Sequence, residues 1–208
     1  MKFVVDLFGL PGSGKTTMAE GVVSHFKNIE IYKLNGRLWG DKGKNSVFYK
    51  IRVITSILRF KYVKIFINNI ILLKNNNLLK KENLIRNIRL ILYFGELEII
   101  FREKKMFYLS DNGLFQTFVS MIFTYDYDLI NLNEVEKIII SFKNVPIIKK
   151  IHFTYVRCDY LTSYERINMR NKSIRSKLDN GDATKKILKW QSDIFDLFLK
   201  HFNNIIMV

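Results

Sequence analysis

Residues 3–17 constrain this chain more than any other stretch, because they join an apolar run, a glycine-rich turn and a helix-forming segment. The run Phe3–Phe8 predicts a short buried strand, and residues 16–26 predict a helix. Between them, GLPGSGKT fills the pattern G-x-x-x-x-G-K-[ST] at every fixed position. Such glycines let successive backbone N–H groups point at phosphate oxygens, and the following helix adds the positive end of its dipole. The stretch therefore predicts a site for a nucleoside triphosphate.

The pattern also assigns roles to single residues. Lys15 is expected to bridge the β- and γ-phosphates, and the Thr16 hydroxyl is expected to ligate Mg²⁺. ATP and Mg²⁺ are therefore the expected cofactors. The residues expected to hold the nucleotide all lie in the turn or at the start of the helix: Gly9, Pro11, Gly12, Ser13, Gly14, Lys15, Thr16 and Thr17.

The composition limits the class of protein. At 208 residues the chain suits one domain, residues 1–208, with a sizeable core. Lys and Arg number 34 against 19 Asp and Glu, and the net charge of +15 predicts anionic partners such as nucleotides, phosphorylated substrates, nucleic acid or an acidic membrane surface. The single cysteine, Cys158, excludes an internal disulfide. Because we find no secretion signal and no apolar run of about 18 residues, we expect a soluble cytoplasmic protein.

Four further apolar runs predict strands: Ile29–Leu34, Lys105–Ser110, Ile147–Val156 and Asn204–Val208. Between the first two of these, residues 46–105 carry apolar residues at spacings of three and four, which predicts about three helices. The tract 61–73 is the exception, since its alternation is also compatible with a strand. We interpret residues 35–105 as a basic helical insert that binds the acceptor, although a row of charges is most often a solvated face.

Polar residues after the predicted strands are candidates for the chemistry. Asp111 follows the strand that ends at Ser110, where a carboxylate can hold Mg²⁺ or accept a proton from an attacking hydroxyl. An aspartate there can also simply cap a helix. Gln116, one turn into the next helix, is a candidate for orienting substrate. Arg37, in a polar loop, either meets an anionic acceptor or is solvated.

Arginines cluster late in the chain. Arg166 and Arg170 are four residues apart and therefore share one face of a predicted helix. Residues 171–181, NKSIRSKLDNG, follow as a polar basic segment containing Arg175, which we interpret as a lid. Guanidinium groups suit a transferring phosphoryl group because their planar forks donate several hydrogen bonds and stay charged. The histidines have no metal-like spacing and are expected to be structural or at the surface: His25, His152 and His201.

Taken together, GLPGSGKTT, YLSDNGLFQ, YERINMR and the RSKLD tract resemble the P-loop kinase superfamily, especially its nucleoside and nucleotide kinase-like members. The resemblance implies a three-layer α/β P-loop NTPase fold with a five-stranded parallel sheet in the order 2-3-1-4-5. It also implies that Arg166, Arg170 and Arg175 form a lid over the ATP phosphates, and that Asp111 serves Mg²⁺ or the acceptor hydroxyl. The chain departs from the family at Asn112, where an arginine is usual after the acid.

The function expected from these residues is ATP-dependent transfer of a γ-phosphoryl group to a small-molecule acceptor: a nucleoside, a nucleotide or a sugar-like metabolite. One alternative is an enzyme directed at nucleic acid, such as a polynucleotide kinase, which the net charge of +15 and the basic insert favour. Another is a regulatory protein that binds nucleotide and turns over little. Steep salt dependence would distinguish nucleic-acid binding from small-molecule binding.

Overall fold

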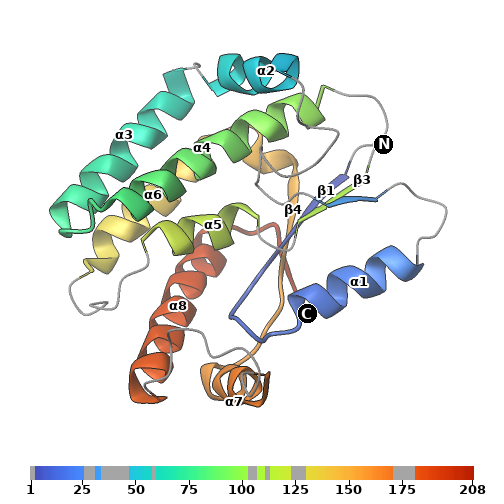
Figure 1. Ribbon diagram of the computed structural model, residues 1–208, viewed down its shortest axis with the longest axis vertical. Coiled ribbons are helices and arrows are strands. Elements are labelled where there is room, and N and C mark those ends of the chain that lie inside the picture. The colour runs from blue at the N-terminus through green and yellow to red at the C-terminus, as the bar shows by residue number, and fades with distance from the viewer. Residues whose placement is uncertain are drawn as a thin grey trace.

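The computed structural model in Figure 1 describes residues 3–25, 31–33, 47–57, 60–102, 107–110, 113–122, 130–170 and 181–208. Its strands form one five-stranded sheet in the order β2-β3-β1-β4-β5, and every neighbouring pair is parallel. The α/β class with a parallel sheet is confirmed, and the strand order is the one implied by the family resemblance. The strands are β1 (Phe3–Phe8), β2 (Ile31–Lys33), β3 (Phe107–Ser110), β4 (Ile151–Tyr155) and β5 (Ile205–Met207).

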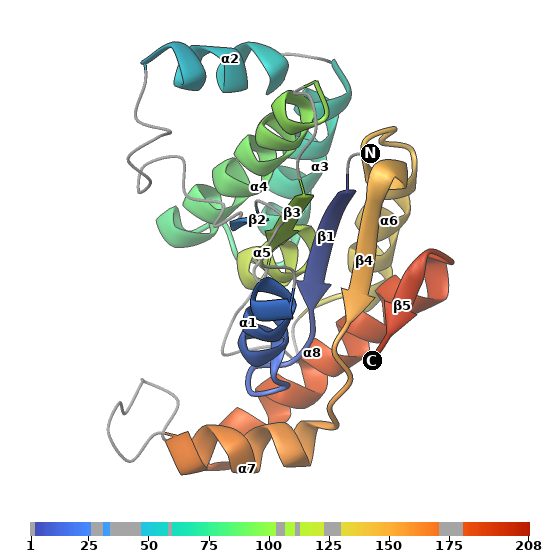
Figure 2. The ribbon, with the colours of Figure 1, turned by 90° about the vertical axis from the view of Figure 1, so that its right-hand side faces the viewer.

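Helices cover both faces of the sheet. In Figure 1, α1 lies on one face, and α4, α5, α6 and α8 lie on the other. Figure 2 shows α7 crossing below the carboxyl ends of β1 and β4. The helices are α1 (Lys15–His25), α2 (Val47–Ile57), α3 (Phe60–Asn75), α4 (Lys81–Ile100), α5 (Leu114–Met121), α6 (Leu132–Lys143), α7 (Tyr160–Arg170) and α8 (Gly181–His201).

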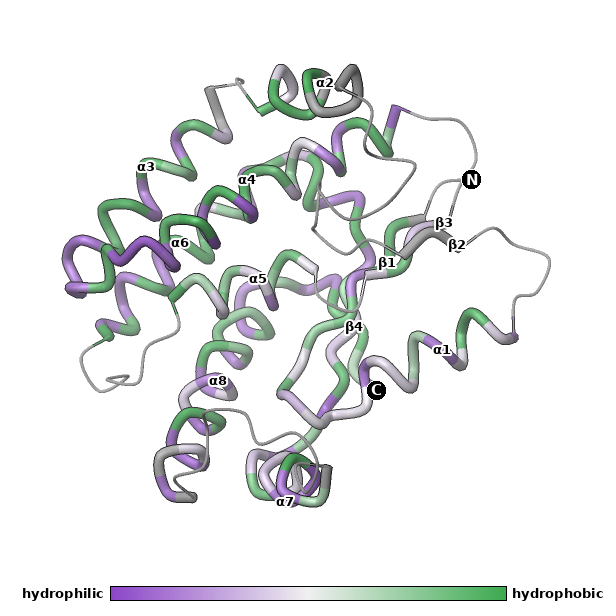
Figure 3. The backbone as a smooth tube through the Cα atoms, in the orientation of Figure 1, coloured by the Kyte–Doolittle hydropathy of each residue, from purple (hydrophilic) through white to green (hydrophobic). Residues whose placement is uncertain are grey.

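Alternation along β1 divides its side chains between the two faces of the sheet. Val4 and Phe8 belong to the large core on the α4–α5–α8 side. Leu7 packs with Ala19 of α1 in a smaller cluster on the opposite face. In Figure 3, hydrophobic and hydrophilic segments alternate along α3, α4 and α8, as expected of helices that bury one side. The central strand is therefore buried on both faces.

Within residues 47–57 and 60–100 the chain forms the three helices α2, α3 and α4, so the strand alternative for residues 61–73 is wrong. Helix α4 is also a major part of the core, since its residues Tyr93, Phe94 and Leu97 are almost completely buried. This helix packs against both α2 and α5. The segment interpreted as an insert therefore contributes to the central layers of the domain.

The strand predicted for Ile147–Val156 is wrong at its start. Residues Ile148–Lys150 form a short 3-10 helix, in which Lys150 N donates to Ile147 O at 3.0 Å, and β4 begins at Ile151. Ile147 and Ile148 are nevertheless buried. They are apolar because they pack into the core, which the sequence alone does not separate from strand pairing.

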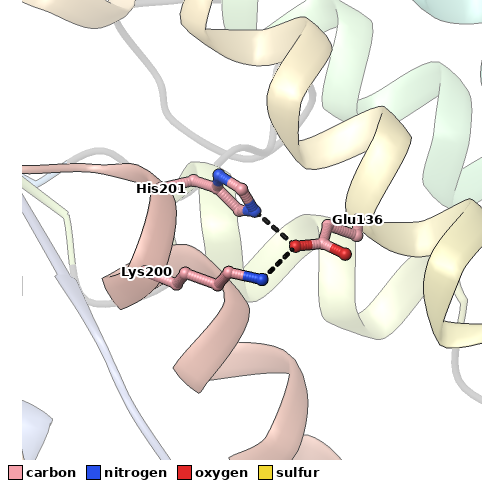
Figure 4. Close-up of polar contacts among 3 residues, drawn as sticks. All are labelled: Glu136, Lys200 and His201. Atoms are coloured by element: carbon pink, nitrogen blue, oxygen red, sulfur yellow. Dashed lines mark hydrogen bonds and ion pairs between the residues drawn. The ribbon is translucent and has the colours of Figure 1, made fainter.

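An ion pair joins α6 to α8 (Figure 4). Glu136 Oε1 accepts a hydrogen bond from Lys200 Nζ at 2.9 Å and lies 2.6 Å from His201 Nε2. These two contacts lower the pKa of Glu136, the hydrogen bond from Lys200 acting most strongly. His201 thus takes part in a contact between two helices. No group of three potential metal-binding side chains occurs in the described part of the chain, and no helix there is long and apolar enough to cross a bilayer.

We expect Gly95→Ala to destabilise the protein, because α2 and α4 are in close contact at this glycine. An added Cβ would lie 2.8 Å from Ile57 Cγ1 and 2.9 Å from the backbone oxygen of Val53. Overpacking of this kind costs about 1–3 kcal/mol, which exceeds the gain of up to ~1 kcal/mol in helix propensity.

The matched control is Gly21→Ala in α1, where an added Cβ meets nothing within 4 Å. This change should stabilise the protein by up to ~1 kcal/mol. Urea denaturation of both variants and the wild type provides the measurement. An equal gain in the free energy of unfolding for the two variants would show that the α2–α4 contact is not tight.

Candidate active site

A glycine-rich turn, which we call the P-loop (residues 9–14), joins the central strand β1 to α1 at the carboxyl edge of the sheet (Figure 2). Gly9, Gly12 and Gly14 have φ angles of 148°, 81° and 100°, which L side chains rarely adopt. Gly9 is also required by space, because a Cβ there would lie 2.5 Å from the backbone oxygen of Val156. The loop therefore has the curled backbone that a phosphate cradle requires.

The hydroxyl groups of the P-loop and of the first turn of α1 fit the predicted ligands. Ser13 is buried, and its Oγ has no hydrogen-bond partner among the described residues. A phosphate oxygen is a suitable partner for a buried hydroxyl in such a cradle. Thr16 is exposed in the first turn of α1, and its oxygen is of the type that Mg²⁺ prefers. These residues therefore fit a nucleotide with Mg²⁺, as do the exposed Thr17 and the half-buried Pro11 beside them.

Lys15 bends back over the P-loop. Its Nζ donates to Gly9 O at 2.8 Å and to Leu10 O at 2.7 Å, and the side chain is half-buried. The ammonium group is thus held beside the loop backbone by two carbonyl oxygens. A charge in this place can neutralise anionic oxygens bound in the cradle.

Helix α7 contacts the P-loop directly. Asp159 precedes the helix, and its Oδ1 accepts from Thr162 N at 2.9 Å. Hydrogen bonding from the side chain and then the backbone of Thr162 lowers the pKa of this carboxyl group. Ser163 Oγ donates to Pro11 O, and Arg166 Nη1 donates to Gly12 O at 3.4 Å. The structure therefore brings Arg166 to the same loop as Lys15.

The other predicted arginines and the predicted acid are placed less fully. Arg170 is the last residue of α7, and its side chain is outside the described part. Arg37, Asp111 and Arg175 lie outside the described residues altogether. Their roles stay predictions.

Gln116 lies in the first turns of α5 and is half-buried, with an Oε1 that has no hydrogen-bond partner among the described residues. In the part of the chain that the structure describes, no hydrogen bond joins it to the P-loop. Its role toward a substrate therefore stays a prediction as well.

Asp6 is a feature of this region that the sequence analysis missed. It lies in the middle of β1 and is completely buried, on the face of the sheet that packs against α4 and α5. Its Oδ2 accepts a hydrogen bond from Leu114 N, the first residue of α5, at 2.6 Å. Its Oδ1 has no hydrogen-bond partner among the described residues. The available signal was a single charged residue within the apolar run FVVDLF, because a charge in a buried strand needs partners.

The surroundings of Asp6 change its acidity. Burial raises the pKa of Asp6 to about 7, while the hydrogen bond from Leu114 N and the nearby Tyr93 hydroxyl act in the opposite direction. Burial and the neighbouring Asp6 also raise the pKa of Tyr93, and Glu96, on the same helix as Tyr93, adds to this effect. The strand β1, the start of α5 and the helix α4 therefore meet at a small polar cluster within the core.

Comparison with solved structures defines the class of fold: it is that of P-loop nucleoside kinases. The deoxyadenosine kinase from M. mycoides with bound dATP superimposes with a TM-score of 0.52 at 16% sequence identity, and the match covers 100% of this chain and 90% of that one. The same enzyme with its products dCMP and dCDP gives a TM-score of 0.46 at 16% identity, over 100% and 90% of the two chains. No protein-family model and no curated protein matches the sequence. The resemblance to nucleoside kinase-like P-loop proteins is thus confirmed for the fold.

We expect the stability of this protein to fall as the pH rises toward 7 because of Asp6. The native pKa of about 7 lies above the ordinary value of 3.8, so the native state binds more protons between these values. The free energy of unfolding should then decrease with pH by up to ~1.4 kcal/mol per pH unit in that window. Asp6→Asn, which cannot titrate, should lack this contribution.

Denaturation of the wild type and Asp6→Asn at about pH 5, 6, 7 and 8 measures the difference directly. The two stabilities should diverge up to the pKa of Asp6 and run parallel above it. Curves that are parallel throughout would show that Asp6 does not titrate in this window.

Proposed function

We propose that this protein transfers the γ-phosphoryl group of ATP to a hydroxyl group of a small-molecule acceptor, with a nucleoside as the favoured class. The observation that carries the proposal is the arrangement around the P-loop, where Lys15 and Arg166 both donate to its backbone oxygens. A glycine cradle with two cations at its rim suits the charge of a triphosphate.

Phosphoryl transfer requires positioning and charge neutralisation more than covalent chemistry from the protein. In the proposed reaction, the acceptor oxygen bonds to the γ-phosphorus as the bond from that phosphorus to the bridging oxygen breaks, and ADP leaves. Asp111 accepts the proton of the acceptor hydroxyl; the alternative is that its carboxylate helps Thr16 to hold Mg²⁺. When bound, Mg²⁺ neutralises charge on the phosphate oxygens.

Helix α7 supplies the remaining positive charge. Arg166 is held within hydrogen-bond distance of the P-loop, and Arg170 follows one turn later on the same helix. We propose that these two residues, with Arg175 in the lid segment 171–181, stabilise charge on the transferring group. Arginine suits this role because it cannot lose its proton.

The acceptor site is assigned to residues 35–105 together with Arg37 and Gln116. Support for a nucleoside acceptor comes from the shared fold with the M. mycoides deoxyadenosine kinase, which was solved with dATP bound. Nucleic acid is the second candidate, because α3, α4 and the residue before α4 expose several basic side chains on a chain of net charge +15: Lys64, Lys74, Lys80, Lys81 and Arg89. ADP release measured against nucleosides, nucleotides, sugars and oligonucleotides, at low and high salt, discriminates the two.

Lys15→Ala should abolish turnover, because it removes the cation nearest the P-loop backbone. We expect a loss of at least about 10²-fold in kcat, in line with the loss of one electrostatic contact in other enzymes. The matched control is Lys149→Ala, an exposed lysine in the 3-10 helix that precedes β4, at the opposite edge of the sheet. Equal ADP release from the Lys15 variant and the wild type would contradict the assigned site.

Arg166→Ala should lower kcat by roughly 10²-fold with a smaller change in the KM for ATP, because the guanidinium acts mainly on charge that develops during transfer. Glu165→Ala changes the exposed neighbouring residue of the same helix and should leave the rate unchanged. Arg166→Lys should recover only part of the loss. If both alanine variants lose the same activity, the effect belongs to the stability of α7 and not to Arg166.

A further inference from the structure

Asp6 connects two segments that are far apart in the sequence. Its strand leads directly into the P-loop, and its Oδ2 accepts from the backbone N–H of Leu114, where α5 begins. Asp6 is also level with Ser110 in the pairing of β1 with β3. The hydrogen bond thus joins the strand that leads into the P-loop to the start of α5, which begins three residues after Asp111 in the sequence.

Gly113 is shaped to fit the Asp6 carboxyl group. Its φ and ψ of −79° and −151° are extended, a conformation open to any residue. An added Cβ, however, would lie 1.7 Å from Asp6 Oδ1 and 2.0 Å from its Cγ. Space taken by the carboxyl group, and not backbone conformation, therefore requires glycine at position 113.

We infer that Asp6 is a positioning residue, whose carboxyl group holds the start of α5, three residues after Asp111 in the sequence, in place relative to the P-loop. The inference rests on the proposed phosphoryl transfer, to which it adds a residue that contacts neither substrate. An ordinary core side chain at position 6 would fill the same space but offer no acceptor to Leu114 N. Burying a carboxyl group in the core costs free energy. An aspartate at position 6 in place of an apolar residue is therefore favourable only if its hydrogen bond to Leu114 N offsets that cost.

The first test observes the contact itself, without turnover. In the wild type, the Leu114 amide should exchange slowly with solvent, because its N–H is buried against the carboxyl group. In Asp6→Ala, the exchange of this amide should be at least about tenfold faster than in the wild type, whereas in Asp6→Asn, which keeps an acceptor oxygen, it should stay within about threefold. NMR hydrogen exchange measures both. An amide that exchanges equally slowly in Asp6→Ala overturns the inference.

The second test measures ADP release from ATP with deoxyadenosine as the probe acceptor. Asp6→Ala should lower kcat by about tenfold or more while the KM for ATP stays within about twofold, since small misplacements of reacting groups reduce rates strongly. Asp6→Asn should retain most of the wild-type rate. Val4→Ala is the control, a truncation on the same strand and the same face, which should lower the melting temperature and leave kcat unchanged.

A paired variant separates positioning from folding. Gly113→Ala alone should lower the melting temperature or prevent folding, and adding Asp6→Ala should restore the fold, because the new methyl group takes the place of the carboxyl group. The double variant should keep the low kcat of Asp6→Ala.

If kcat recovers with the melting temperature, or if Val4→Ala loses as much rate as Asp6→Ala, the positioning role is overturned. If the wild type releases no ADP with any acceptor, the proposed function fails, and the exchange of the Leu114 amide alone decides whether Asp6 holds α5.

Discussion

The pairing of β1 between β3 and β4 is the constraint on which the candidate site depends. All three strands run parallel, so they end at the same edge of the sheet, and ligand sites of open α/β sheets form there. Pairing with β4 continues past the strand, because Val156 N donates to Phe8 O at 2.9 Å. That contact brings the backbone of residue 156 against Gly9, where no side chain fits. The P-loop and the approach to α7 are thus fixed by one set of backbone hydrogen bonds.

The aromatic core ties this edge to the helices behind it. Phe8, the last residue of β1, meets Phe115 edge-on with ring centroids 5.0 Å apart, and Phe115 stacks on Phe198 of α8 at 3.8 Å. Each such pair contributes about 0.5–1.5 kcal/mol beyond the burial of its area. Phe8, which ends the strand leading into the P-loop, is therefore packed against α5. The same two elements are joined by the contact from Asp6 to Leu114, so packing and hydrogen bonding act on one junction.

The parts of the fold that could be predicted are those encoded locally. The P-loop needs glycines and a lysine at fixed spacing, and apolar periodicity located α1 and the helices between β2 and β3. What could not be predicted depends on partners distant in the chain. Asp6 shows only as one acid in an apolar run, and its contacts come from α4 and α5. Ile147 and Ile148 were predicted as strand residues because a buried residue at a 3-10 helix is apolar, as is a buried residue in a strand. Likewise, the extent to which α4 is buried could not be predicted, because it depends on packing against α2 and α5 and not on the periodicity of its own sequence.

The helix α4, which is part of the proposed acceptor region, lies close to β1, the strand that leads into the P-loop. Tyr93 and Glu96 lie on this helix and are buried; Tyr93 acts on the pKa of the Asp6 carboxyl group of β1, and Glu96 acts on that of Tyr93. The helices around such a buried polar contact tolerate little displacement, because a carboxyl group that loses its partners in a nonpolar core strongly destabilises the folded protein. A shift of α4 on binding an acceptor would therefore change the surroundings of Asp6 and, through Leu114, the start of α5. In this fold, α4, the strand that leads into the P-loop and the start of α5 therefore meet at the same buried carboxyl group.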